Sequence, residues 1–90
     1  MAAYTVEVRP AVRKALRKLS ADVRKDVLAV MGGLAEDPRP PGVRALQGHR
    51  PYLRVRSGDY RVIYAVDDAA CLVTVAVVGH RRDVYRNLGL

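Results

Sequence analysis

The stretch Arg54–Arg61, RVRSGDYR, decides how the second half of this chain folds. Its centre, Gly58-Asp59, suits a two-residue hairpin loop of type II′, whose first residue needs the positive φ that glycine adopts without strain. A turn at this position sets Arg56 directly opposite Arg61. The flanking residues are rich in β-formers, so we predict an antiparallel pair of strands at 52–57 and 60–66.

Alternation along this hairpin separates an apolar face from a basic face. The apolar face holds Leu53, Val55, Val62, Tyr64 and Val66, and the basic face holds Arg54, Arg56 and Arg61. Like charges directly opposite each other destabilise a sheet by roughly 0.2–1 kcal/mol, so the Arg56–Arg61 pair favours a phosphate-binding surface over a purely structural one. The alternative is that Asp59, Asp83 or a helix carboxylate neutralises the pair.

The next apolar run, Cys71–Val78, is typical of a central strand. A four-residue loop at 67–70 would pair it with the hairpin so that Tyr64 faces Val73 and Arg61 faces Ala76. The two hairpins then agree on which side is the core, and the basic face is expected to be concave and floored with small residues. This register adds Val73, Val75 and Val77 to the apolar face, and Thr74 and Ala76 to the basic face.

The first half of the chain predicts one strand and two helices. Residues 4–8 alternate as in a short strand, and Pro10 fits the first turn of a helix. Apolar residues then recur at steps of three or four, and Ser20 interrupts them at a good N-cap position, which predicts helices at 10–19 and 21–36. The fold class is therefore α+β, in the order β-α-α-β-β-β, with a helical hairpin on one face of a mostly antiparallel four-stranded sheet.

Length and composition indicate a single domain, 1–90, with one modest core. The segment 37–51 holds four of the five prolines and is expected to be an ordered loop or short linker, because too little chain follows it for a second domain. The net charge is +7, and residues 39–90 contain nine arginines against four acidic residues. Arginine forks bind phosphate oxygens bidentately, so the favoured partner is a polyanion such as nucleic acid. The alternative is a solubilising surface in an arginine-rich proteome.

Other classes of protein find little support in the sequence. The single cysteine, Cys71, cannot form an internal disulfide, and its apolar surroundings favour a buried thiol. No zinc-ligand spacing is present. The N-terminal residues lack an apolar signal-peptide core, and the longest apolar run is too short to span a bilayer. We therefore expect a cytoplasmic protein that does not bind membranes.

A second group of polar residues follows the apolar run in Val77–Arg86, VVGHRRDVYR. Histidine can take up or release a proton near neutral pH, arginine stabilises negative charge, and tyrosine stacks on bases. The alternative is a solvated, charged C-terminal segment. If the chain leaves the strand at Gly79, four of these side chains reach the edge of the basic face: His80, Arg81, Arg82 and Tyr85.

Together these motifs resemble the RelE/ParE superfamily of bacterial toxins, most closely its RelE-type messenger-RNA endoribonucleases. The resemblance extends over nearly the whole chain, including the first strand and the helical hairpin. RelE-type toxins often continue into a C-terminal helix, and we expect that helix to be short or absent here. The motifs that carry the resemblance are Leu46-Gln-Gly48, Tyr52-Leu-Arg-Val-Arg56, Gly58-Asp-Tyr-Arg-Val-Ile-Tyr64 and Val78-Gly-His-Arg-Arg-Asp-Val-Tyr85.

The resemblance implies a toxin of a type II toxin–antitoxin system that cleaves messenger RNA in the ribosomal A site, without a metal or other cofactor. In this family a ribose 2′-hydroxyl attacks the adjacent phosphate and leaves a 2′,3′-cyclic phosphate. The implied partners are messenger RNA, the ribosome and a cognate antitoxin with an acidic, partly disordered segment. Operator DNA would be bound only through the complex with the antitoxin.

Matched by position, the strand residues take the following roles. Arg54 matches a catalytic basic residue, Arg61 matches the phosphate-stabilising arginine, and Arg56 is expected to bind backbone phosphate. Tyr85 matches the catalytic-site tyrosine that stacks on the target base. One departure is Tyr52, since the family has a second basic residue at this position, two before Arg54.

The roles of the C-terminal residues stay open. Counting forward from Gly79, Arg81 matches the family's C-terminal catalytic arginine. Counting back from Tyr85 makes Arg82 its rival; otherwise Arg82 is expected to bind RNA phosphate. His80 occupies a position that is lysine in some members, and it is expected to act as acid or base in place of the missing basic residue.

Three other functions compete with messenger-RNA cleavage. A ParE-like toxin would inhibit DNA gyrase by binding and would cut nothing. A non-catalytic nucleic-acid-binding domain would bind with strong salt dependence and without strand scission. A degenerate toxin would be kept only for autoregulation. Arg61 and the Gly79–Tyr85 segment favour the ribonuclease, because ParE-like chains generally lack this set.

Overall fold

A five-stranded sheet forms the centre of the computed structural model, which describes residues 3–86 and 88–90. The elements are β1 (Thr5–Val8), α1 (Pro10–Arg17), α2 (Ala21–Gly33), β2 (Arg44–Ala45), β3 (Leu53–Ser57), β4 (Tyr60–Asp67) and β5 (Leu72–His80). The strands lie in the order β1-β5-β4-β3-β2, with β1 parallel to β5 and the other neighbours antiparallel. The predicted α+β class is confirmed, and the sheet has one strand more than predicted because β2 forms within the expected loop.

Both helices begin where the sequence predicts and end earlier. Pro10 is the first residue of α1, and the Ser20 hydroxyl caps α2 by accepting a hydrogen bond from the Val23 N–H at 3.4 Å. α2 ends at Gly32-Gly33 because glycine is a poor helix former, and the following residues tighten into i→i−3 hydrogen bonds. None of the helices in residues 3–86 and 88–90 is long and apolar enough to cross a membrane.

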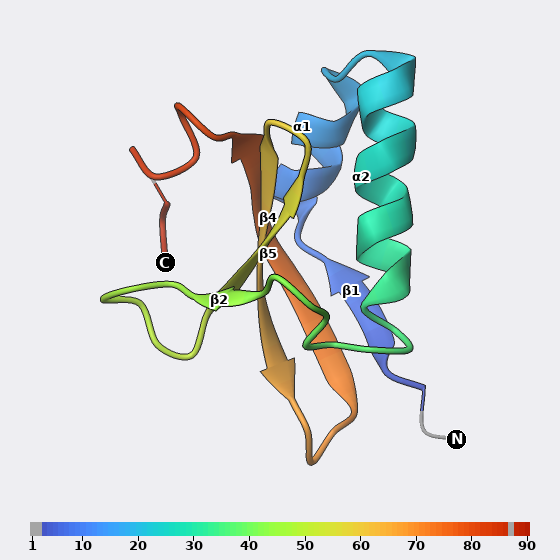
Figure 1. Cartoon of the computed structure of the whole chain (residues 1–90), viewed down its shortest axis with the longest axis vertical. Helices are drawn as coiled ribbons and strands as arrows, with labels where there is room; N and C mark the ends of the chain where they lie inside the picture. Colours follow the sequence, from blue (N-terminus) through green and yellow to red (C-terminus); the bar gives the residue numbers. More distant parts are fainter. Residues whose placement is uncertain (1–2, 87) are drawn as a thin grey trace.

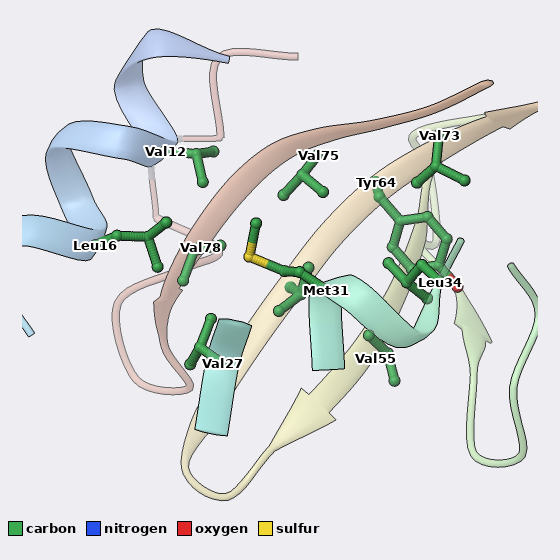
Figure 2. Close-up of a cluster of buried hydrophobic side chains, with 11 residues drawn as sticks. Val12, Leu16, Val27, Met31, Leu34, Val55, Tyr64, Val73, Val75 and Val78 are labelled. Atoms are coloured by element: carbon green, nitrogen blue, oxygen red, sulfur yellow. The ribbon is translucent and has the colours of Figure 1, made fainter. Parts of the chain in front are cut away.

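The two helices cover one face of the sheet, the C-terminal segment lies on the other side, and β2 forms the edge of the sheet beyond β3 (Figure 1). Figure 2 shows the side chains buried between the helices and the strands. At one end of this core, the Tyr64 hydroxyl donates a hydrogen bond to the Pro38 carbonyl at 2.7 Å, and burial raises the pKa of Tyr64 to about 12. The core residues are Val12, Leu16, Val27, Met31, Leu34, Val55, Val62, Tyr64, Val73, Val75 and Val78.

The hairpin of β3 and β4 has the predicted register, with Arg56 opposite Arg61 and Leu53 opposite Tyr64. Gly58 has a φ of 59°, as the first position of a type II′ turn requires. One face of the hairpin therefore joins the core, and the other presents the arginines.

The predicted register of β4 with β5 is wrong. Tyr64 pairs with Val75 rather than with Val73. The turn lies at residues 68–71 and ends in Cys71, whose φ of 50° is left-handed. Residues other than glycine rarely adopt such a φ, so nothing in the sequence indicated that the turn would extend to a cysteine.

A β-bulge then exchanges the faces of the last part of β5. Ala76 has no partner across the pair. Beyond it, Val78 rather than Val77 belongs to the core, and Gly79 rather than Ala76 lies opposite Arg61. The extra residue therefore changes which side chains reach the basic face.

The basic face is not floored with small residues, as expected, but carries a small apolar cluster. Ile63 is fully buried there, although its strand neighbours on the same face are polar or small. The cluster supports the basic face from below and gives the C-terminal segment a place to pack. We call it the second cluster; its buried members are Leu46, Ile63 and Val84, with Tyr52, Val77 and Leu88 packed against them.

Candidate nucleic-acid interface

Four arginines from three neighbouring strands line one pocket on the basic face. Arg44 pairs with Arg54 across β2 and β3, and Arg56 pairs with Arg61 across β3 and β4. Together with Gly42 they line a space of about 280 Å³, which we call the arginine pocket. Alternate positions of a strand share a face, so β3 directs Arg54 and Arg56 to the same side.

No carboxylate neutralises the arginine pocket within the described part of the chain. The carboxylates suggested as neutralising partners, Asp59 and Asp83, bind other arginines. The pocket therefore concentrates positive charge that an anion such as phosphate would compensate. The ion pairs among the described residues join Arg39 to Asp68, Arg81 to Asp59 and Arg86 to Asp83.

Arg61 is held firmly in the arginine pocket. Only 8% of the residue is exposed, and its Nη1 donates hydrogen bonds to the carbonyls of Gly58 and Tyr60 at 3.2 and 3.1 Å. Its Nε is buried and has no hydrogen-bond partner among the described residues. The two hydrogen bonds of Nη1 fix the guanidinium, so it is positioned in advance for an anion that enters the arginine pocket.

The C-terminal segment brings Tyr85 to Arg54, as expected. Nη1 of Arg54 donates to the Tyr85 hydroxyl at 2.9 Å, and its guanidinium carbon lies 6.0 Å from the ring centroid. A second depression, of about 340 Å³, lies beside this pair and is also lined by Ala45, Leu46 and Gln47. Tyr85 is 40% exposed, so its ring is accessible for stacking on a base.

Val84 anchors this segment on the basic face. It is 5% exposed and packs in the second cluster with Leu46 and Ile63. It also lies against Gly79, where a Cβ would stand 3.3 Å from the Val84 Cβ. The glycine at the end of β5 therefore gives the chain room to fold back towards the arginines.

Arg81 and Arg82 have different surroundings. The Arg81 N–H donates to the Asp59 carbonyl at 2.7 Å, and its Nε lies 3.7 Å from Asp59 Oδ1. The Arg82 N–H donates to Nδ1 of His80 at 3.2 Å, and Arg82 itself is exposed. Neither residue lines the arginine pocket.

His80 is not brought together with the arginines. It pairs with Tyr60 across β4 and β5, and the two rings meet edge to face with centroids 5.4 Å apart. Tyr60 packs against the core, so His80 lies on the helix side of the sheet. The bulge at Ala76 is the cause, because it moves every later residue of β5 to the opposite face.

Two features of the basic face were not predicted. Arg44 belongs to a two-residue strand inside a proline-rich loop, and only the count of arginines in this half of the chain hinted at it. Arg9, directly before α1, donates from Nη2 to the Tyr52 hydroxyl at 2.9 Å. No local pattern could indicate that contact, since 43 positions separate the two residues.

The same sequence pattern occurs in known toxins. A family model described as ParE toxin of type II toxin-antitoxin system, parDE, matches residues 6–85. Toxin RelG of Mycobacterium tuberculosis is 31% identical over 84 residues, which cover 92% of this chain and 97% of RelG.

Solved structures share the fold. The archaeal RelE–RelB complex from Pyrococcus horikoshii contains a chain that superposes with a TM-score of 0.79 at 29% identity, covering 90% of this chain and 98% of that chain. A mutant of Escherichia coli toxin RelE in the free state gives a TM-score of 0.75 at 28% identity, covering 97% of this chain and 95% of that chain. The chain therefore belongs to the RelE/ParE superfamily of toxins from type II toxin–antitoxin systems.

Proposed function

We propose that this toxin is a metal-independent endoribonuclease that cleaves messenger RNA on the ribosome. The arginine pocket carries the proposal. It gathers four guanidinium groups that no carboxylate among the described residues neutralises. One of them, that of Arg54, donates a hydrogen bond to the Tyr85 hydroxyl. A phosphate and an adjoining base match this combination of charge and aromatic surface.

The chemistry would be attack of a ribose 2′-hydroxyl on the adjacent phosphate. The bond from the 2′-oxygen to phosphorus forms, the bond to the 5′-oxygen breaks, one proton leaves the 2′-hydroxyl and one reaches the 5′-oxygen. Arg54 and Arg61 would stabilise the charge that builds up on the phosphate oxygens, and Arg56 would hold a neighbouring phosphate. A fixed donor of this kind contributes about 3–4 kcal/mol to a transition state, and Arg61 is fixed by its bonds to the hairpin turn.

Tyr85 would orient the target nucleotide. Its exposed ring stands beside the 340 Å³ depression, and its hydroxyl is held by Arg54. A base stacked there would place its ribose next to the arginine pocket. Alignment of this kind favours in-line attack by the 2′-oxygen.

Separate roles are proposed for three residues where the C-terminal segment begins: His80, Arg81 and Arg82. Arg81 is the catalytic candidate, because its ion pair with Asp59 is exposed and weak enough for a phosphate to replace it. Arg82, which is exposed, would bind RNA phosphate. His80 lies on the helix side, so we assign it a positioning role: its Nδ1 holds the Arg82 N–H and with it the start of the tail.

A cognate antitoxin is the proposed protein partner. The Pyrococcus horikoshii relative was solved as a RelE–RelB complex, and the Escherichia coli relative as an intact RelBE toxin–antitoxin complex. An acidic antitoxin segment would be attracted by the unneutralised arginine pocket. Operator DNA would be bound through that complex, and a ribosomal substrate would mean that the toxin acts in the cytoplasm.

Inhibition of DNA gyrase is the second candidate function. The observation that favours it is the family model, which is described by ParE and matches most of the chain. Such a toxin would bind its target and cut nothing, so the two candidates differ in what happens to messenger RNA.

The deciding experiment is induced expression in bacteria, with messenger-RNA 5′ ends mapped in wild type, Arg54→Ala and Arg56→Ala. New 5′ ends in register with codons, lost in both variants, would support the ribonuclease. Growth arrest with intact messages would contradict it and support gyrase inhibition. Arg17→Ala is the matched control, since it removes an exposed arginine from α1 on the other side of the sheet and should change nothing.

A further inference from the structure

A second arginine–tyrosine pair on the basic face repeats the geometry of the first. Nη2 of Arg9 donates to the Tyr52 hydroxyl at 2.9 Å, and its guanidinium carbon lies 5.9 Å from the ring centroid. The corresponding values for Arg54 and Tyr85 are 2.9 and 6.0 Å. Each pair joins parts of the chain that are far apart in sequence, so the fold and not local structure creates the contact.

The two pairs rest on one support. Tyr52 comes directly before β3, two positions from Arg54, which corresponds to about 7 Å along an extended chain. Tyr52 packs against the second cluster, and Val84 of that cluster immediately precedes Tyr85. Leu46, which lines the depression beside Tyr85, donates its N–H to the Tyr52 carbonyl at 2.9 Å. The second cluster therefore holds both tyrosines on the same face.

The charge of Arg9 is not compensated in this arrangement. A tyrosine hydroxyl is a neutral acceptor and occupies one of the five N–H donors of a guanidinium. Glu7 is exposed two positions earlier, and no ion pair joins it to Arg9 among the described residues. Arg9 is itself exposed, so a phosphate can reach its remaining donors.

We propose that Arg9 and Tyr52 form a second nucleotide subsite, which binds the RNA nucleotide next to the one held by Arg54 and Tyr85. Arg9 binds the backbone phosphate, and the ring of Tyr52 stacks on the base. The inference rests on the proposed RNA substrate. It adds that the basic face binds at least two consecutive nucleotides of that RNA.

The test is binding of single-stranded RNA that carries 2′-O-methyl groups and so cannot be cut. Fluorescence anisotropy would compare a single nucleotide that carries a phosphate, which is too short to fill both subsites at once, with a six-nucleotide oligomer. Arg9→Ala should bind the oligomer about tenfold more weakly, with a salt slope lower by about 0.7, and should bind the single nucleotide as wild type does. Tyr52→Phe, which keeps the ring and loses only the hydroxyl that Arg9 binds, should lose less affinity for the six-nucleotide oligomer than Tyr52→Leu, which removes the ring.

Arg17→Ala is the matched control for loss of one positive charge, and thermal unfolding checks that each variant is folded. Wild-type affinity of folded Arg9→Ala for the six-nucleotide oligomer would overturn the subsite, as would an equal loss in Arg17→Ala. If Arg54→Ala weakens binding and Arg9→Ala does not, the subsite fails and the proposed function survives. If Arg9→Ala weakens binding and Arg54→Ala does not, the subsite stands and the proposed cleavage site fails.

Discussion

Gly79 and Val84 touch where the chain leaves the sheet: a Cβ on Gly79 would stand 3.3 Å from both the Cβ and the Cγ2 of Val84. This contact connects β5 to the second cluster, of which Val84 is a member. Tyr85, the residue after Val84, then reaches Arg54. The position of the proposed base-stacking tyrosine therefore depends on the absence of a side chain six residues earlier.

Gly79→Ala should move the tail and lower cleavage more than it lowers stability. The new methyl group would be too close to Val84, and overpacking of this kind costs about 1 kcal/mol when a neighbour can shift. The measurement is urea unfolding together with RNA cleavage. Gly32→Ala is the control, because nothing lies within 4 Å of its added Cβ and alanine favours helix. Full cleavage by a stable Gly79→Ala variant would contradict the proposed link.

Arg61→Ala should abolish cleavage while changing the free energy of unfolding by less than about 1 kcal/mol. The variant loses two hydrogen bonds to the turn, worth about 1 kcal/mol each, but it also removes the buried Nε and the repulsion from Arg56. Val62→Asp, one residue away on the fully buried side, should unfold the protein. Circular dichroism of both variants checks this, and similar behaviour would show that the faces of β4 are misassigned.

Arg54→Ala should reduce cleavage by about a hundredfold, as expected for a lost charge-stabilising donor. Tyr85→Phe should cost less, because the stacking ring stays and only the hydroxyl bound by Arg54 is lost. Tyr85→Ala removes the ring and should resemble Arg54→Ala. Single-turnover cleavage rates on programmed ribosomes would order the three variants, and a larger defect in Tyr85→Phe than in Tyr85→Ala would contradict stacking.

His80→Asn should retain cleavage, whereas His80→Ala should reduce it. The asparagine Oδ1 can accept a hydrogen bond from the Arg82 N–H in place of Nδ1 of His80. If His80 acts only through this hydrogen bond, the C-terminal segment keeps its position in His80→Asn. His49→Ala, which removes a histidine outside the site, is the comparison and should be unaffected. Cleavage rates across neutral pH test the assignment: equal losses in both His80 variants would indicate that His80 transfers a proton.

Tyr64 should make the fold less stable in alkali. Its pKa is raised from the ordinary 10.0 to about 12, mainly by burial, while the charge of Arg39 opposes the rise and that of Asp37 adds to it. Between these values the unfolded chain releases the phenol proton and the folded chain keeps it, so the free energy of unfolding falls as pH rises. Tyr64→Phe should show a shallower fall, and at neutral pH should lose about 1 kcal/mol with the bond to Pro38. Urea unfolding from pH 8 to 11 measures both; parallel curves would contradict the shift.

The first hairpin could be predicted because its turn has a chemical signature. Gly58 adopts the positive φ that its turn needs, and the register of every facing pair follows from that position. The grouping of Arg54, Arg56 and Arg61 on one face then follows from alternation alone. This part of the candidate site was accessible to sequence reasoning because only local rules determine it.

The second hairpin could not be predicted in the same way. Its turn ends in a left-handed cysteine, Cys71, and its strand contains an unpaired Ala76, neither of which has a residue signature. The contacts of Val84 and of Arg9 depend on packing between distant segments, so they appear only in the folded chain. His80 was expected near the arginines because the chain was predicted to leave the strand at Gly79, whereas β5 continues through His80.

The unpaired Ala76 has a consequence for the comparison of this toxin with its relatives. One residue more or fewer in the last strand exchanges the two sides of everything that follows, up to the point where the tail packs again at Val84. A pairwise alignment should therefore place a gap within the last strand at the bulge, where the backbone can absorb a residue, because a gap elsewhere in the strand would exchange the side chains of the two faces.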